Sequence, residues 1–228
     1  MAISGKIIDL RNLLAIRFPQ APTAVGTRLL TGLASFDQPI GNGLPKSAIT
    51  ELISPRGSAG SASLVHAFIH GAYRDQYFVA LIDGGDSFDP CGLVNSILRQ
   101  LLWVRCTKAF EAVKAADLLL RDGNFPLVIV DLILNSPEEL RKIPQTTWYR
   151  LQRLVESVPI ACLVLTRYEM VSSAQLKLVL ENYWNLETLE KQDAISQLPI
   201  VVKRSHLKSV APPLVATATY GAASNGRW

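Results

Sequence analysis

The segment that decides the fold runs from Glu51 to His66 and reads "ELISPRGSAGSASLVH". An apolar run leads into a cluster of serine, proline and glycine, and apolar residues then recur at helical spacing. That order is typical of a phosphate-binding loop, which joins a strand to a helix and lets backbone N–H groups contact phosphate. We therefore predict a strand, a glycine-rich loop and a helix over these residues.

The loop lacks the side chains that a working phosphate-binding loop uses. The consensus is G-x-x-x-x-G-K-[ST], in which the lysine reaches the β- and γ-phosphates and the hydroxyl binds Mg²⁺. Counted from Gly60, Ser61 stands where the lysine belongs and Ala62 where the hydroxyl belongs. Backbone dipoles alone contribute about 1–2 kcal/mol per interaction at most. We expect no ATP hydrolysis and a vestigial loop site made of Pro55, Gly57, Gly60, Ser61 and Ser63.

Nucleotide binding stays an alternative interpretation of the same loop. Arg56 or Lys46 could supply the missing cation, and the serines of the loop could supply a hydroxyl. Asp131 ends the apolar run "LVIVD" and could bind Mg²⁺ at the carboxyl end of a strand. Because the lysine is absent, we interpret Asp131 as kept for the fold. We expect no cofactor, with ATP and Mg²⁺ as the less favoured outcome.

Strand and helix patterns alternate along the chain. Short apolar runs such as "YFVALID", "LLWV", "PLVIVDL" and "IACLVL" predict buried strands, and stretches with helical spacing separate them. The clearest helix spans 107–124, where Thr107 is expected to cap the start and Gly123 to end the last turn. This alternation predicts an α/β fold with a mostly parallel central sheet and helices on both faces.

The last third of the chain departs from this alternation. Residues 172–189 are expected to begin as a helix and turn into a strand. Two further strands are expected over 198–204 and 212–220, and such late strands commonly join a parallel sheet in antiparallel fashion. The chain should therefore carry antiparallel strands near its C-terminus.

The domain organisation follows from these patterns and from the length of 228 residues. A helical spacing over 7–17 is followed by prolines, so we expect an N-terminal helix and linker over 1–22. A single α/β domain is expected over 23–221, and a small, polar, flexible tail over 222–228.

Composition excludes several classes of function. No apolar run approaches the roughly 20 residues of a membrane helix, and the start does not resemble a secretory signal, so we expect a cytoplasmic chain without a membrane partner. Three widely spaced cysteines fit neither a disulfide framework nor a zinc site, and we expect buried, inert thiols. His66 and His70 lack a third ligand, so no metal is expected. The net charge of +4 permits nucleic acid or an acidic protein as partner without requiring either.

Two groups of polar residues each allow a functional and a structural interpretation. Aspartates at 83, 86 and 89 surround a Gly-Gly turn and could orient a water molecule, but we favour turn formation. A second group could bind nucleic acid through cations and stacking aromatics, but we favour a solvated helix with a buried tryptophan. This second group consists of Arg141, Lys142, Trp148, Tyr149, Arg150 and Arg153.

Three quoted segments, taken in order, resemble those of bacterial RecA-like proteins. They are "LLTGLASFDQPIGNGLPKSAITELISPRGSAG", "ALIDGGDSFDP" and "LLWVRCTKAFEAVKAADLLLRDGNFPLVIVDL". The likeness also includes "VVKRSHLKSVAPPLVATATY" and so spans roughly 29–220. It implies a RecA-like core, in this chain with a degenerate phosphate loop.

The departures from the RecA pattern imply a damaged catalytic set. Ser61 takes the place of the loop lysine and Gly85 that of the catalytic glutamate, while Asp131 keeps the Mg²⁺-ligand position. Lys203 matches one of two lysines that RecA sends across a subunit interface, and Ser205 replaces the other. The two DNA-binding loops are shortened to "LNSPEELRKIPQ" and "TRYEMVSS", so we expect DNA binding to be weak or indirect.

One branch of RecA relatives is most similar to this chain, namely the ImuA-like proteins of translesion DNA synthesis, with the cell-division inhibitor SulA as distant kin. The similarity lies in the degenerate loop and in "LLWVR" followed by an alanine-rich helix and an R-x-G turn. It implies a non-catalytic adaptor or regulator in the DNA-damage (SOS) response, with translesion polymerase components or RecA as partners. The alternatives are a DNA-binding ATPase with an unconventional loop, and an SOS cell-division inhibitor.

Overall fold

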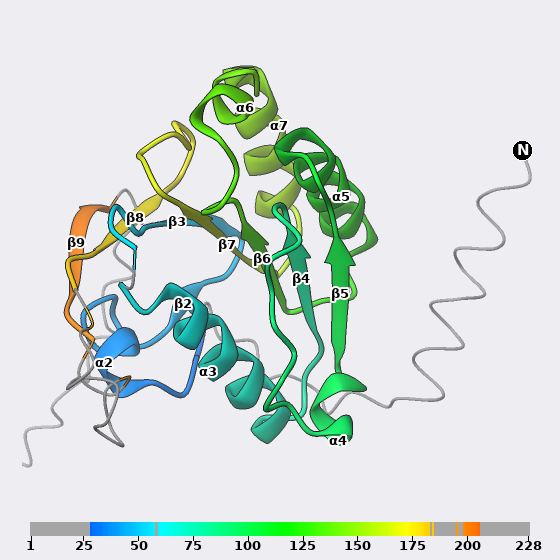
Figure 1. Ribbon diagram of the computed structural model, residues 1–228, viewed down its shortest axis with the longest axis vertical. Helices are drawn as coiled ribbons and strands as arrows, with labels where there is room; N and C mark the ends of the chain where they lie inside the picture. The colour runs from blue at the N-terminus through cyan, green and yellow to red at the C-terminus, as the bar shows by residue number, and fades with distance from the viewer. Residues whose placement is uncertain (1–27, 58, 183, 185–194, 196–197, 206–228) are drawn as a thin grey trace, which may run out of the picture.

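The computed structural model describes residues 28–57, 59–182, 184, 195 and 198–205 (Figure 1). The predicted N-terminal helix and linker over 1–22, the strand over 212–220 and the tail over 222–228 lie outside the described residues.

A seven-stranded sheet in the order β5-β4-β6-β7-β3-β8-β9 forms the centre of the molecule (Figure 1). All neighbouring strands are parallel except β8 and β9, which are antiparallel. The predicted α/β class with a mostly parallel sheet is therefore confirmed. The strands are β3 (Ala48–Ile53), β4 (Val79–Asp83), β5 (Leu101–Arg105), β6 (Leu127–Asp131), β7 (Ala161–Thr166), β8 (Leu176–Leu180) and β9 (Ile200–Ser205).

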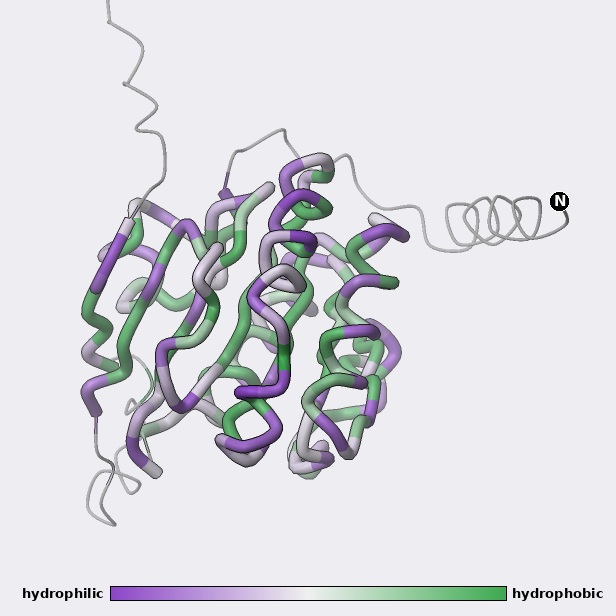
Figure 2. The backbone as a smooth tube through the Cα atoms, turned by 90° about the horizontal axis from the view of Figure 1, so that it is seen from above, coloured by the Kyte–Doolittle hydropathy of each residue, from purple (hydrophilic) through white to green (hydrophobic). Residues whose placement is uncertain are grey.

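Helices cover both faces of the sheet. On one face α3 (Ser61–Arg74) packs through Leu64 and Phe68, and on the other α5 (Ala109–Asp122) and α7 (Gln145–Glu156) pack through residues such as Val113 and Trp148. Figure 2 shows hydrophobic residues running along the strands, whereas the helices alternate hydrophobic and hydrophilic residues. The amphipathic spacing seen in the sequence thus places one apolar stripe of each helix on the sheet.

The remaining elements are short. They are α2 (Ala34–Asp37), α4 (Asn95–Leu98), α6 (Pro137–Arg141) and a separate antiparallel pair, β1 (Arg28–Leu29) with β2 (Leu44–Pro45). Asp37 ties this pair to α2, because its carboxylate accepts hydrogen bonds from the amide and the hydroxyl of Thr31 at 2.9–3.2 Å.

The predicted helix at the start of 172–189 is wrong. The segment before β8 forms turns, because Gln175 exchanges hydrogen bonds with the backbone of Ile49 and the Ser173 hydroxyl donates to the carbonyl of Trp148. These contacts align β8 parallel to β3, whereas β9, which matches the strand predicted over 198–204, joins the sheet in antiparallel fashion as expected.

The ends of α5 confirm one prediction and correct another. Gly123 ends the helix with φ 77°, in the left-handed region that glycine adopts without strain. The N-cap, however, is Lys108, and Thr107 contacts the carboxylate of Glu111 instead of capping the helix. The thiols also differ from expectation in one case, since Cys106 and Cys162 are buried whereas Cys91 is exposed.

Candidate functional site: a degenerate phosphate loop

The loop between β3 and α3 has the strand–loop–helix arrangement that the sequence predicts. The amide of Ser54 donates to the carbonyl of Thr166 at 2.8 Å, which holds the start of the loop beside the end of β7. Gly60 has φ 89° and is the N-cap of α3, and its carbonyl accepts from the amide of Leu64 at 2.9 Å. Ser61 and Ser63 lie in the first turn of α3 and are partly exposed, whereas Pro55 and Gly57 are exposed. The described residues around the loop therefore have the predicted strand–loop–helix order, and phosphate binding by the loop stays a prediction.

Apolar side chains cover this loop at Gly60. A Cβ atom built on Gly60 would lie 3.1 Å from Cζ2 of Trp184 and 3.2 Å from Cδ2 of Leu198. Both side chains are buried in the same hydrophobic cluster as Leu64 and Val65 of α3. The chain beyond β8 thus returns to pack on the loop. Sequence analysis missed this cover, because nothing local links Trp184 to a glycine more than a hundred residues earlier.

The two candidate replacement cations differ in where they lie. Lys46 precedes β3 and therefore lies at the amino end of the sheet, next to Ser47, whose amide donates to the carbonyl of Ile160. A strand of this length spans about 20 Å, so Lys46 lies at the end of β3 opposite to the loop and is too far away to contact an anion there. Arg56 is exposed within the loop itself. Of the two, only Arg56 is placed to contact an anion there.

Asp131 lies at the carboxyl end of β6, which is the position predicted for it. Its carboxylate accepts from the amide of Ile133 at 3.0 Å and neighbours Asp83, the cross-strand partner at the end of β4. The pKa of Asp131 is raised to about 6, mainly by burial; the hydrogen bond from the amide of Ile133 opposes the shift, and the nearby charge of Asp83 contributes to it. A cation bound beside this carboxylate would stabilise its charged form. The hydrogen bond to Ile133 is equally compatible with a structural role at the end of the strand.

Asp83 and Asp89 accept hydrogen bonds from nearby backbone amides, as favoured from the sequence, whereas Asp86 pairs with a side chain of β5. The carboxylate of Asp83 accepts from the amides of Ser87 and Phe88 at 2.8 and 2.7 Å. Asp86 forms an ion pair with Arg105 at 2.6 Å, which lowers the pKa of Asp86, and Asp89 accepts from the amide of Cys91.

Gly85 occupies the place where the resemblance puts a catalytic glutamate. Glycine supplies no carboxylate at this exposed position. A Cβ added there would lie 3.2 Å from Cβ of Leu134, so the position adjoins an apolar side chain.

Lys203 belongs to a row of alternating charges that crosses the sheet from β3 to β9. Glu51 on β3 contacts Lys177 on β8 at 2.9 Å, Lys177 contacts Glu169 at 3.0 Å, and Glu169 contacts Lys203 on β9. We call these four residues the charge row. The hydrogen bonds from Lys203 and then from Lys177 lower the pKa of Glu169 to about 2. Within the chain, the ammonium group of Lys203 pairs with Glu169. A role of Lys203 at a subunit interface stays a prediction.

The inner half of the charge row is fully buried. Glu51 has 0% and Lys177 2% of its surface exposed, and the carboxylate of Glu51 also accepts from the amides of Met170 and Val171 at 2.8 and 3.0 Å. Sequence analysis did not identify this pair. The signal was one charged residue in the middle of each apolar strand, "AITELI" and "LKLVL", which buried strands tolerate only when the charges are paired.

The predicted basic and aromatic group separates into buried and exposed members. Trp148 has 0% exposure and cannot stack on a base, and Arg150 pairs with Asp117 at 2.9 Å. Tyr149 and Arg153 remain exposed. The favoured interpretation, a solvated helix with a buried tryptophan, is confirmed.

The two histidines of α3 lie apart from any group of metal-binding side chains in the described part of the chain. The ring of His66 packs against Phe88 with centroids 5.1 Å apart, and His70 is exposed. Within the described residues, no group of three or more His, Cys, Asp or Glu side chains is arranged to hold a metal ion. Over the same residues, none of the helices has both the length and the apolarity needed to cross a bilayer.

Comparison with known proteins finds partial similarity to RecA. The chain is 31% identical over 117 residues to RecA of Clavibacter michiganensis, which covers 50% of this chain and 31% of that protein. It is 29% identical over 106 residues to RecA of Leifsonia xyli (45% and 29% covered) and 27% identical over 106 residues to RecA of Frankia alni (45% and 30% covered). No family model matches the chain. The aligned part thus spans about a third of each RecA, and it supports a RecA-like superfamily relationship.

Proposed function

We propose that this chain is a non-catalytic RecA-fold adaptor of the DNA-damage response, which acts in the cytoplasm through contacts with translesion polymerase components or with RecA. One observation carries the proposal: the strand–loop–helix scaffold is retained, while Ser61 replaces the loop lysine and Trp184 and Leu198 pack on Gly60. A scaffold kept without the charge needed for its chemistry fits a role in binding.

Several independent parts of ATPase chemistry are changed together. The loop has no lysine to bind the β- and γ-phosphates, and Ala62 cannot supply a hydroxyl to Mg²⁺. Gly85 carries no carboxylate to orient water. Phosphoryl transfer depends on positioned charges more than on any covalent step, so each loss weakens the same electrostatic stabilisation of the transition state.

Exposed apolar surface supports a role in protein contacts. Phe110 and Leu118 of α5 are 48% and 67% exposed, and Leu102 of the outer strand β5 is 38% exposed. These residues lie within the segment "LLWVRCTKAFEAVKAADLLLRDGN", which carries much of the likeness to ImuA-like proteins. Large apolar side chains that are exposed in this way are available for contact with a partner protein.

The proposal is tested by capture experiments with purified partners. The full chain, immobilised, is expected to retain a translesion polymerase component or RecA at physiological salt. In a parallel titration with a fluorescent ATP analogue and Mg²⁺, no saturable binding and no phosphate release are expected. An adaptor function is contradicted when neither the polymerase components nor RecA are retained.

A nucleotide-dependent DNA-binding protein is the second candidate. It is favoured by the left-handed Gly60 at the start of α3, by Asp131 at the end of β6 and by the exposed Arg56 in the loop. Saturable ATP binding that is lost in Arg56→Ala and Asp131→Ala would support this candidate over the adaptor. Titration with and without single-stranded DNA measures whether the two ligands are coupled.

A further inference from the structure

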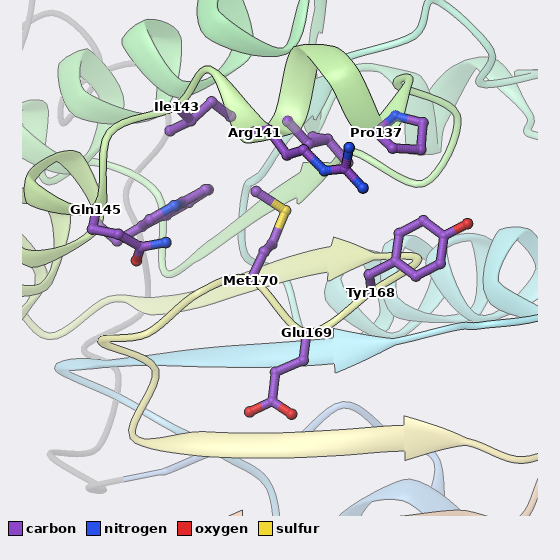
Figure 3. A pocket seen from close by; sticks show the side chains of 9 residues that line it. Pro137, Arg141, Ile143, Gln145, Tyr168, Glu169 and Met170 are labelled. Carbon is purple, nitrogen blue, oxygen red and sulfur yellow. The ribbon is translucent and has the colours of Figure 1, made fainter.

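A groove of about 610 Å³ lies between the α6–α7 helix pair and the segment that follows β7 (Figure 3). We call it the α6–β7 groove. Its apolar lining includes Leu140, Ile143, Trp148 and Met170, while the polar Arg141 belongs to the same lining. The volume lies within the roughly 300–1,000 Å³ of protein pockets that bind ligands. The groove is separate from the phosphate loop, because it lies on the sheet face covered by α7 and the loop leads into α3 on the other face.

The lining is suited to a large apolar side chain. Leu140, Ile143 and Trp148 have 6%, 3% and 0% exposure and form firm walls that belong to the core. Met170 is partly buried and Tyr168 is 54% exposed, and both line the same space. Methionine adapts its shape to different partners, and exposed tyrosine supplies contact area at low entropic cost.

The charge that the groove leaves unbalanced is positive. Glu169 lines the groove, but its carboxylate points away from it in Figure 3 and pairs with Lys177 and Lys203. Arg141 is exposed, and in the part of the chain that the structure describes it has no acidic side chain within ion-pair distance, including Glu138 on the same helix. An occupant with a carboxylate near its apolar side chain would therefore complement the groove.

The same features disfavour nucleic acid as the occupant. Single-stranded nucleic acid needs several cations along its backbone and exposed aromatic faces for its bases. Here the lining holds one unpaired cation and one exposed aromatic side chain, Tyr168, because Trp148 is fully buried. A peptide with one anchoring side chain requires neither a row of cations nor a stacking platform.

We propose that the α6–β7 groove binds a short segment of a partner protein in which a large apolar side chain lies within a few residues of an aspartate or glutamate. The apolar side chain packs between Met170, Tyr168 and Ile143, and the carboxylate pairs with Arg141. This site gives the adaptor a defined partner surface, and in that respect it rests on the proposed function.

A displayed library of random peptides, selected on the full-length chain, tests the proposal. Synthetic copies of the enriched peptides are labelled with fluorescein, and their affinities are measured by fluorescence anisotropy. The enriched sequences are expected to combine Leu, Phe, Trp or Met with Asp or Glu. Arg141→Glu is expected to weaken their binding by about tenfold or more, because it places two carboxylates together. Tyr168→Ala is expected to weaken binding several-fold.

Arg153→Glu is the matched control, since it makes the same charge change at an exposed position of α7 outside the groove lining. Arg141 and Tyr168 are exposed, so both variants should melt like the unaltered chain, and melting curves verify this. Affinities that are equal in Arg141→Glu and Arg153→Glu would overturn the proposal. So would a selection that yields no peptide sensitive to Tyr168→Ala, or one that yields lysine-rich peptides.

Two outcomes separate this proposal from the function on which it rests. If the unaltered chain and Arg141→Glu capture RecA or a polymerase component equally well, the adaptor function stands and the groove is not its site. If the chain captures none of these proteins but the selected peptides behave as expected, the groove stands and the adaptor function fails. A fluorescent single-stranded oligonucleotide that binds the chain but not Arg141→Glu, and is unaffected by Tyr168→Ala, would assign the groove to nucleic acid.

Discussion

The middle of β3 contains a buried charged side chain with a partner, whereas the loop that follows β3 lacks the charged side chain expected there. In the middle of the strand, Glu51 is fully buried and has Lys177 at 2.9 Å and two backbone amides as partners. In the loop, Ser61 replaces the expected cation, and Trp184 and Leu198 pack on Gly60. A buried charge is retained at one place, and a charge is missing at the other, within the same strand–loop–helix unit.

The difference lies in what each charge needs as a partner. The buried pair is complete within the chain and depends on no ligand. A lysine in a phosphate loop has its counter-charge only while a nucleotide is bound, and an unpartnered charge beside apolar groups is costly. If the chain is the proposed adaptor and binds no nucleotide, a loop without the lysine is the more stable one, whereas the loss of either member of the buried pair would be strongly destabilising.

The largest effect is expected when the buried pair is broken. Lys177→Met leaves the Glu51 carboxylate without its counter-ion at a fully buried position, and we expect the free energy of unfolding to fall by about 3–5 kcal/mol. Urea denaturation at pH 7 measures the change. Lys203→Met is the matched control at the exposed end of the charge row, where we expect a loss of about 1 kcal/mol or less.

The double variant Glu51→Gln with Lys177→Met distinguishes the charge from the shape of the pair. It is expected to recover part of the stability lost in Lys177→Met, because a neutral amide leaves no unpaired charge. A loss below about 1 kcal/mol in Lys177→Met would mean that water reaches Glu51 and that the contrast with the loop does not hold.

A smaller effect of opposite sign is expected at Asp131. Its folded-state pKa of about 6 exceeds the ordinary value for aspartate, so ionisation costs stability as the pH rises from about 4 through 6. Asp131→Asn keeps an acceptor for the amide of Ile133 and removes the charge. We expect it to be more stable by about 2 kcal/mol at pH 8 and nearly equal at pH 4, as measured by urea denaturation at both pH values.

Asp83→Asn serves as the contrasting control for that prediction. Asp83 accepts several hydrogen bonds from the turn at 84–88, so the loss of its charge should lower stability. If Mg²⁺ stabilises the unaltered chain but not Asp131→Asn, the carboxylate is a cation ligand, and the nucleotide-binding candidate gains support over the adaptor.

Gly60 tests the apolar cover of the loop directly. Gly60→Ala adds a Cβ at φ 89° and within 3.2 Å of two side chains, and we expect a loss of about 1–3 kcal/mol. Gly57→Ala is the matched control in the same loop, because a Cβ there meets no atom within 4 Å. The cost of Gly60→Ala should shrink when it is combined with Trp184→Ala, and thermal melting of the single and double variants measures this coupling. Equal costs at Gly57 and Gly60 would contradict the packing of Trp184 on the loop.

Most helices and strands could be predicted from the sequence, because their signals lie within short stretches of the chain. Helical spacing and short apolar runs assign α5, α7 and the parallel strands β3 to β7, and Gly123 marks a helix end by its need for positive φ. The helix expected before β8 failed for a non-local reason: Gln175 exchanges hydrogen bonds with Ile49 of a distant strand. Propensity alone cannot include such a contact.

The site was predictable only in part for the same reason. The missing lysine and the position of Asp131 follow from spacing within a motif, and the structure places Ser61 at the start of α3 and Asp131 at the end of β6. The cover by Trp184 and Leu198, the Glu51–Lys177 pair and the α6–β7 groove each join segments far apart in the chain. A lone charge in an apolar strand can signal that a partner exists, but the fold is needed to identify that partner.

The smallest effect is expected at the exposed end of the charge row. The folded-state pKa of Glu169, about 2, is below that of an unfolded glutamate, so its pairing with Lys203 and Lys177 stabilises the chain above about pH 4.5 and is lost as the pH falls towards 2. Because the side chain of Glu169 is 40% exposed, solvent screens the pairing, and we expect Glu169→Gln to cost about 1 kcal/mol at pH 7.

The pH dependence separates this electrostatic role from a packing role. Urea midpoints of Glu169→Gln and the unaltered chain should converge between about pH 4.5 and 2, and 1 M salt should reduce their difference at pH 7. Glu138→Gln, at an exposed acidic position of α6 outside the charge row, should show no such convergence. A deficit in Glu169→Gln that stays constant with pH would mean that Glu169 holds the segment after β7 by shape. The charge of buried Lys177 would then be stabilised by Glu51 alone, and the contrast between strand and loop would depend on that single ion pair.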